Sequence, residues 1–184
     1  WVKEKKFRQN VKIFKNFKNF TDFNLEALIV ANASSNHKFA IQKGLNARIP
    51  VLVEKPITLS YSDTLEMIQL AKEKNTFFES AHVFLFSSYL KKFSTYISHL
   101  EAVKSIDIEW SDPKIEDRYG EKKFFDPSLP IFYDLLPHTL SILKVLLGKS
   151  SLEFKFLKFK RGGSELEIDF LLEEIDCNVR LARN

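Results

Sequence analysis

The pattern of hydrophobic and polar positions over residues 27–56 predicts a strand, a helix and a second strand. Residues 27–31 form a short apolar run with the β-branched Ile29 and Val30, which is typical of a strand buried on both faces. Residues 50–53 form a second apolar run of the same kind. A helix between two strands this close in sequence places them in parallel, joined by a right-handed crossover.

The segment between these strands predicts a turn followed by a helix. Residues 32–36 are small and polar, and Ser34 or Ser35 can cap the helix. Helical spacing predicts one buried face, with Gly44 near the end of the helix. The residues of that face are Phe39, Ala40, Ile41 and Leu45.

The pattern continues with two more helices and a strand up to about residue 100. Ser60 or Ser62 can cap a helix that ends near Lys74, and residues 77–81 read as the next strand. Ser87 or Ser88 can cap a helix that reaches about His99. The residues expected to face inward on this last helix are Tyr89, Leu90, Phe93, Ile97 and Leu100.

The pattern changes after residue 101, where we expect a domain boundary between residues 1–100 and 101–184. Residues 103–110 alternate between apolar and polar side chains, which is typical of an antiparallel strand with one wet face. Residues 112–130 are polar and predict a long loop. Residues 152–160, 165–172 and 175–181 read as strands, with a hairpin turn at 161–164.

Residues 131–148 predict a buried helix that carries two polar groups near its start. Pro137 is tolerated best in a first turn, so the helix is expected to begin near Asp134 and to end at Gly148. Asp134 and His138 are four residues apart and therefore share one helical face. The pair could be purely structural, an N-terminal cap with a histidine bonded to it, or it could belong to a functional site.

Two charged residues end the strand at residues 50–53, in the tripeptide Glu54-Lys55-Pro56. Ligands bind at the carboxyl ends of strands in open parallel sheets, so residues 32–37 and 54–56 are expected to share one ligand-facing edge. The strand must turn sharply after Lys55, and only an X-Pro bond adopts the cis form at low cost. We therefore expect a cis peptide between Lys55 and Pro56.

Composition narrows the functional classes only modestly. The net charge of +4 is compatible with an anionic ligand, and the basic residues 1–20 could contact nucleic acid, although a helix end and a short strand are the better interpretation. No apolar run reaches the length of a membrane span, and Asp134 with His138 gives too few ligands for a metal site. The single Cys177 fits a reducing compartment, and we expect a cytoplasmic location.

The chain resembles the Gfo/Idh/MocA oxidoreductases, named after glucose–fructose oxidoreductase and inositol dehydrogenase. The resemblance rests on three motifs: Glu54-Lys55-Pro56 after the βαβ unit, Ala31-Asn32-Ala33 followed by His37, and Asp134 with His138 before Gly148. Asn-Ala stands where the family carries Thr-Pro. The implied fold class is α/β, a partial Rossmann-type parallel sheet followed by an α+β domain with a mainly antiparallel sheet.

The resemblance implies an enzyme that uses NAD or NADP. It would transfer a hydride between the nicotinamide and a hydroxyl or keto carbon of a sugar, nucleotide sugar or cyclitol. The implied catalytic residues are Lys55, Asp134 and His138, with Asp134 fixing the His138 ring, and we expect the three to lie around one cavity between the two domains. His82 would join them in binding substrate, or it is a loop histidine bonded to a backbone carbonyl. The implied cofactor-binding residues are Ala31, Asn32, Ala33, Asn36, His37, Glu54 and Lys55.

The sequence contains no G-x-G-x-x-G turn to cradle the pyrophosphate. We therefore expect this chain alone to bind NAD(P) poorly and to be inactive. The alternative is a non-catalytic family member or subunit that keeps the fold for binding or assembly. The expected partner is a small sugar-like molecule, with neither nucleic acid nor membrane, and the full-length form is expected to be a homo-oligomer through the second-domain sheet.

Overall fold

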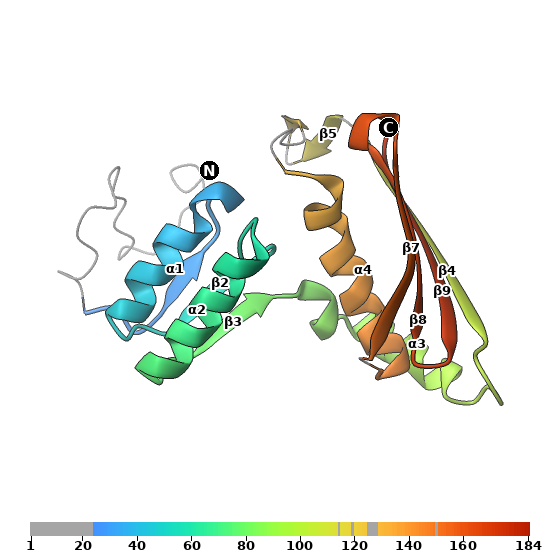
Figure 1. Cartoon of the computed structure of the whole chain (residues 1–184), viewed down its shortest axis with the longest axis horizontal. Coiled ribbons are helices and arrows are strands. Elements are labelled where there is room, and N and C mark those ends of the chain that lie inside the picture. Colours follow the sequence, from blue (N-terminus) through green and yellow to red (C-terminus); the bar gives the residue numbers. More distant parts are fainter. Residues whose placement is uncertain (1–23, 114, 119, 125–128, 150) are drawn as a thin grey trace.

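The computed structural model describes residues 24–113, 115–118, 120–124, 129–149 and 151–184. The predictions for residues 1–20 lie outside this range. Two separate larger sheets organise the described chain, and a long helix, α4, lies between them (Figure 1). The α/β fold class is confirmed.

The first sheet has three parallel strands in the order β1-β2-β3. They are β1 (Leu28–Val30), β2 (Val51–Glu54) and β3 (Phe78–Ala81). Helices α1 (His37–Asn46) and α2 (Tyr61–Lys74) pack side by side on one face of this sheet (Figure 1). Ile41, Leu45, Val51, Val53 and Met67 are fully buried between these layers.

The structure corrects the predicted start and inward face of α1. A 3₁₀ turn, η2 (Ser34–Asn36), precedes the helix. The N-cap residue of α1 is Asn36, and its side chain makes no capping hydrogen bond. The buried face includes His37, whereas Phe39 is 58% exposed beneath the Lys43 ammonium. His37 can be buried because both ring nitrogens lie within hydrogen-bonding distance of backbone oxygens. For α2, the prediction of Ser60 as N-cap is confirmed.

Gly44 lies where α1 approaches the sheet too closely for a side chain. A Cβ atom there would lie 2.7 Å from Cγ2 of Val51 and 2.9 Å from Cδ2 of Leu28. We predict that Gly44→Ala lowers the free energy of unfolding by about 1–3 kcal/mol, because overpacking outweighs the gain in helix propensity. Urea denaturation measures this, with exposed Asn46→Ala on the same helix as the control. Equal effects of the two substitutions would contradict the close approach.

The second sheet is mixed and has the order β4-β9-β8-β7. Its strands are β4 (Ser105–Asp112), β9 (Ile175–Arg183), β8 (Glu165–Leu172) and β7 (Leu152–Lys160). Strand β4 pairs in parallel with β9, so the antiparallel prediction for residues 103–110 is wrong, while β9–β8 and β8–β7 are antiparallel as expected. The alternation of apolar and polar residues in β4 shows that one face of the strand is exposed to solvent, but it does not identify the neighbouring strand.

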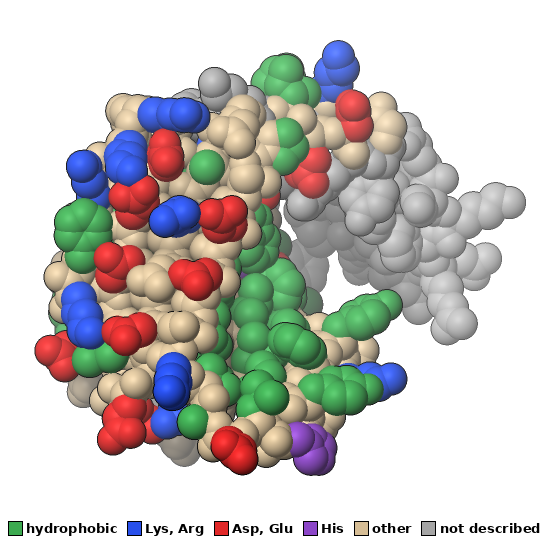
Figure 2. All heavy atoms as spheres, turned by 90° about the vertical axis from the view of Figure 1, so that its right-hand side faces the viewer, with side chains coloured by type: hydrophobic (Ala, Val, Ile, Leu, Met, Phe, Trp, Pro, Cys, Tyr) green, Lys and Arg blue, Asp and Glu red, His purple; other side chains and the backbone are tan. Residues whose placement is uncertain are grey.

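One face of this sheet packs on α4 (Ile131–Leu147), and the other is exposed and charged. The core beneath α4 contains Leu135, Leu143, Ile168, Phe170 and Val179. Figure 2 shows basic and acidic side chains interspersed over one part of the surface, with a strip of hydrophobic side chains beside them. On the outer face, Arg180 pairs with Glu109 at 3.2 Å, and Asn178 donates to Asp107 at 2.9 Å.

Three further predictions for the second half of the chain need correction. Residues 112–130 contain a hairpin of β5 (Ile115–Arg118) and β6 (Glu121–Phe124) rather than only a loop. Helix α4 begins at Ile131 with Pro130 as N-cap, so Pro137 is inside the helix, where it removes a single backbone hydrogen bond. Helix α3 (Ser88–Ile97) has no buried residue, and Tyr89, Phe93 and Leu100 are exposed instead of inward. Gly148 ends α4 with φ 70°, as predicted.

Candidate functional site

Lys55 leaves the carboxyl end of β2 and reaches the first turn of α4. Its Nζ donates to Oδ1 of Asp134 at 2.5 Å and to the Asp134 backbone oxygen at 2.8 Å. The peptide between Lys55 and Pro56 is cis, which confirms that prediction. Lys55 and Asp134, 79 residues apart in sequence, therefore lie in direct contact, while a cavity around Lys55, Asp134 and His138 stays a prediction.

Asp134 is shared between two cations. Its second oxygen, Oδ2, accepts from Nη2 of Arg183 at 2.5 Å, and the Arg183 side chain is only 6% exposed. Burial raises the pKa of Asp134, but the hydrogen bonds and positive charges of Lys55 and Arg183 outweigh burial and lower it below 3.8. Asp134 is therefore ionised at neutral pH.

His138 follows Asp134 by one helical turn but is held by aromatic rings. Its ring stacks on Trp110, with centroids 5.7 Å apart and planes at 16°, and meets Phe84 edge-on at 5.2 Å. Within the described part of the chain, its buried Nδ1 has no hydrogen-bond partner. The expectation that Asp134 fixes the His138 ring is therefore wrong, because the two carboxylate oxygens of Asp134 accept from Lys55 and Arg183.

Burial, followed by the charge of Lys55, lowers the pKa of His138 from 6.5 to about 4. The imidazole is therefore neutral at pH 7 and can accept a proton. His82 lies close enough to contribute to this shift. It follows β3, and its own buried Nδ1 also has no partner among the described residues.

The predicted cofactor-binding residues gather at the carboxyl ends of β1 and β2. Ala31, Asn32, Ala33 and Asn36 are exposed, and Glu54 and Lys55 are half-buried. His37 differs, because it is 1% exposed and its Nδ1 and Nε2 lie 2.8 Å from Pro56 O and 3.1 Å from Asn32 O. His37 thus connects the loops after the two strands and has almost no surface for direct ligand contact.

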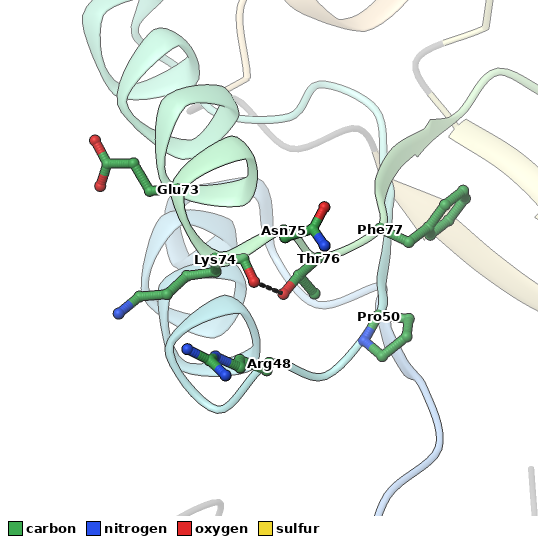
Figure 3. A pocket seen from close by; sticks show the side chains of 7 residues that line it. All are labelled: Arg48, Pro50, Glu73, Lys74, Asn75, Thr76 and Phe77. Atoms are coloured by element: carbon green, nitrogen blue, oxygen red, sulfur yellow. Dashed lines mark hydrogen bonds between the residues drawn. The ribbon is translucent and has the colours of Figure 1, made fainter.

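A separate pocket lies at the opposite edge of the first sheet, beside the starts of β2 and β3 (Figure 3). Its volume is about 360 Å³. Lys74 and Arg48 line it, and Thr76 Oγ1 donates to the Lys74 backbone oxygen at 3.1 Å. Parallel sheets bind ligands at the carboxyl ends of strands, so this pocket is at the wrong edge for a nucleotide.

Residues 3–82 match a family model described as the Gfo/Idh/MocA oxidoreductase family, NAD-binding Rossmann fold. This match contains the βαβ unit, Glu54-Lys55-Pro56 and His37. The first part of the chain is therefore similar to the NAD-binding domain of that family.

Two proteins are similar in sequence to part of this chain. A 2,7-anhydro-N-acetylneuraminate hydratase of Mediterraneibacter gnavus is 39% identical over 62 residues, which are 34% of this chain and 17% of the hydratase. Human biliverdin reductase A is 29% identical over 100 residues, which are 54% of this chain and 34% of the reductase. The chain thus matches well under two thirds of either relative's length.

Solved structures show that the likeness in fold extends into the second domain. An NAD-binding protein from Listeria innocua has a TM-score of 0.72 at 17% identity, covering 94% of this chain and 53% of that protein. A protein assigned as a myo-inositol dehydrogenase, from Sinorhizobium meliloti, has a TM-score of 0.67 at 14% identity, covering 86% and 51%. The chain spans about half the length of these structures.

Three residues of this candidate site were missed by sequence reasoning, namely Arg183, Trp110 and Phe84. Arg183 had a usable signal, because it continues the inward-facing series Ile175, Cys177, Val179 and Leu181 on β9. A charged residue at a core position of a strand requires a buried partner. Trp110 and Phe84 had no such signal, since an aromatic residue on an apolar face is most simply explained as core.

Within the described ranges, no group of three or more His, Cys, Asp or Glu side chains is placed to hold a metal ion. The same part of the chain has no helix that is long and apolar enough to cross a membrane.

We predict that NMR titration of the native chain places the His138 midpoint near pH 4, with exposed His99 as an internal reference. The low pKa means that unfolding takes up a proton at His138. Its contribution to stability is therefore complete above about pH 6.5 and is lost as the pH falls through 6.5 toward 4. A native midpoint near 6.5 would show that the ring is solvated, contrary to the packing on Trp110 and Phe84.

Proposed function

We propose that this chain is part of an NAD(P)-dependent oxidoreductase that transfers a hydride between nicotinamide and the hydroxyl or keto carbon of a sugar, nucleotide sugar or cyclitol. The observation that carries the proposal is the ion pair between Lys55 and Asp134 beside a neutral His138. It joins the ligand-facing edge of a Rossmann sheet to a second domain. The substrate class is supported by the names of the neuraminate hydratase and the inositol dehydrogenase.

The exposed loop at Asn32 and Ala33 and the half-buried Lys55 fit a dinucleotide that lies across the carboxyl ends of β1 and β2. Bound NAD(P) would supply or accept the hydride. The sequence lacks G-x-G-x-x-G, so these loops would have to hold the cofactor without that turn. Weak cofactor affinity and no turnover by this chain alone remain our expectation.

Lys55 can donate a hydrogen bond to the reacting oxygen of the substrate. An ammonium group has three N–H donors, and two of those at Lys55 are directed at Asp134. The third can donate to the reacting oxygen and stabilise the negative charge that develops there. The proposed position of this oxygen is between Lys55 and His138.

His138 is assigned as the base that accepts the proton from the substrate hydroxyl during oxidation. Its pKa of about 4 keeps the imidazole unprotonated at pH 7, so a nitrogen lone pair is available to accept a proton. In the reverse direction, the protonated His138 would return the same proton to the carbonyl oxygen, while Lys55 again stabilises the negative charge that develops there. His82, with its unpartnered Nδ1, is proposed to bind the substrate on the same side.

A non-catalytic family member or subunit is the second candidate. One observation favours it: a pKa of about 4 makes His138 a weak base. Such a protein would keep the fold and the ion pair for binding or assembly. Assembly of the full-length form as a homo-oligomer through the second sheet, and a cytoplasmic location, likewise remain predictions.

The test is an NMR titration of the ¹⁵N-labelled chain with NAD(P)H at millimolar concentrations. We expect backbone shifts at residues 31–33 and 54–55, and smaller shifts for Lys55→Ala. Shifts confined to the pocket around Arg48 and Thr76 would reject the proposal. Adding a Gly-rich β-α unit before residue 27 then separates the two candidates, since only the enzyme would gain hydride transfer to keto-sugars.

A further inference from the structure

Arg183 is a buried cation that the proposed chemistry does not use. It ends β9 on the face that packs toward α4, and it is 7% exposed. Its Nη1 donates to the Leu129 backbone oxygen at 3.0 Å, and its Nη2 donates to Asp134 Oδ2 at 2.5 Å. Arg183 thus links the end of the last strand to the start of the helix that carries Asp134 and His138.

The two oxygens of Asp134 are divided between two cations. Oδ2 faces Arg183, and Oδ1 faces Lys55. The planar guanidinium fixes the direction of the carboxylate, because it contacts Leu129 and Asp134 at the same time. His138, four residues later, receives no bond from this carboxylate, and its Nδ1 is unpartnered within the described ranges.

We propose that Arg183 is a positioning residue that orients the Asp134 carboxylate toward Lys55 and away from His138. Arg183 occupies one carboxylate oxygen and keeps Asp134 ionised, so the other oxygen orients the Lys55 ammonium. His138 then acts as a neutral imidazole outside any Asp–His pair. The inference rests on the proposed function only in taking Lys55 as the group that meets the substrate.

A merely structural role for Arg183 would have different consequences. Its bond to Leu129 O could simply tie β9 to the segment before α4. In that case the positive charge would be incidental, and the protonation of Asp134 and the environment of Lys55 would not depend on it. The two roles can therefore be separated by substitutions that keep or remove the charge.

The test compares Arg183→Gln with Arg183→Lys in the 184-residue chain, without any cofactor. The readouts are the pKa of the Asp134 carboxyl by ¹³C NMR and the rate at which Lys55 is acetylated, measured by mass spectrometry. In Arg183→Gln we expect the pKa of Asp134 to rise and the Lys55 rate to increase several-fold. Arg183→Lys should restore most of both values, because it restores the charge.

Arg180→Gln is the matched control, since Arg180 lies on the same strand with its side chain exposed on the outer face. It should leave both readouts unchanged. The proposal is overturned if Arg183→Gln behaves like the control, or if Arg183→Lys changes both readouts as much as Arg183→Gln does.

If Arg183→Gln does not fold, the rate of Lys55 acetylation is measured in Asp134→Asn instead, because this substitution keeps the shape of the side chain and removes its charge. Lys55 acetylation should again accelerate, and an unchanged rate would overturn the proposal. Because neither experiment uses NAD(P), a failure of cofactor binding would reject the proposed function without changing these results.

Discussion

Asp134→Ala is expected to lower the free energy of unfolding by about 3–5 kcal/mol, because it breaks an ion pair that is largely removed from solvent. The Lys55 and Arg183 side chains are only 14% and 6% exposed, and Asp134 lies between them. Without the carboxylate, two cations would face each other across the junction between the domains. Urea denaturation at pH 7, followed by circular dichroism, measures the effect.

Asp176→Ala is the matched control, because Asp176 pairs with Lys155 at 2.9 Å while 60% exposed. An exposed pair of this kind contributes about 0–1 kcal/mol. A similar loss for both substitutions would show that Asp134 is no more important to the fold than a surface carboxylate. Acid should also destabilise the wild type, because the pKa of Asp134 is lowered and its contribution is lost as the pH falls below 3.8.

Phe170→Ala is expected to cost about 3–5 kcal/mol, the range for removing a large aromatic side chain from a packed core. Phe170 is 1% exposed on β8, and its ring meets Phe154 at a centroid distance of 6.1 Å. It belongs to the core beneath α4, so its loss would also loosen the helix that positions Asp134 and His138.

The control for this substitution is Phe156→Ala. Phe156 lies opposite Asp169 on the outward face of the sheet and is 45% exposed. Its replacement should change stability by no more than about 0.5–1 kcal/mol. If Phe156→Ala proved as costly as Phe170→Ala, the assignment of inner and outer faces to β7 would be wrong.

The Rossmann sheet was predictable because its strands are short apolar runs joined by helices. Local pattern was less reliable for the helix faces. Phe39 was expected on the buried face of α1, yet it is exposed and His37 is buried there, with its ring nitrogens near two backbone oxygens that can accept from the ring N–H. The start of α4 was misplaced because the cost of Pro137 inside a helix is outweighed by burial of Ile131 and Leu135.

The pairing of β4 could not be predicted from its own residues. Its alternation matches any half-buried edge strand, and its partner β9 begins 70 residues after it in sequence. In a similar way, the meeting of Lys55 and Asp134 followed from the sheet edge and the family motifs. The bond from Arg183 to Asp134 could not be predicted from local spacing, because the two residues are 49 apart in sequence.

The central claim is that the dinucleotide lies across the carboxyl ends of β1 and β2, with its nicotinamide next to the substrate oxygen that is proposed to lie between Lys55 and His138. Transferred nuclear Overhauser effects test it directly, because they are observed when a ligand binds weakly and exchanges quickly. With NAD(P)H present, we predict cross-peaks from the nicotinamide ring protons to the ring protons of His138 and Trp110, which Lys55→Met should weaken and exposed Lys72→Met should leave unchanged. Cross-peaks from the nicotinamide only to Phe77 and Thr76, at the opposite edge of the sheet, would contradict the account.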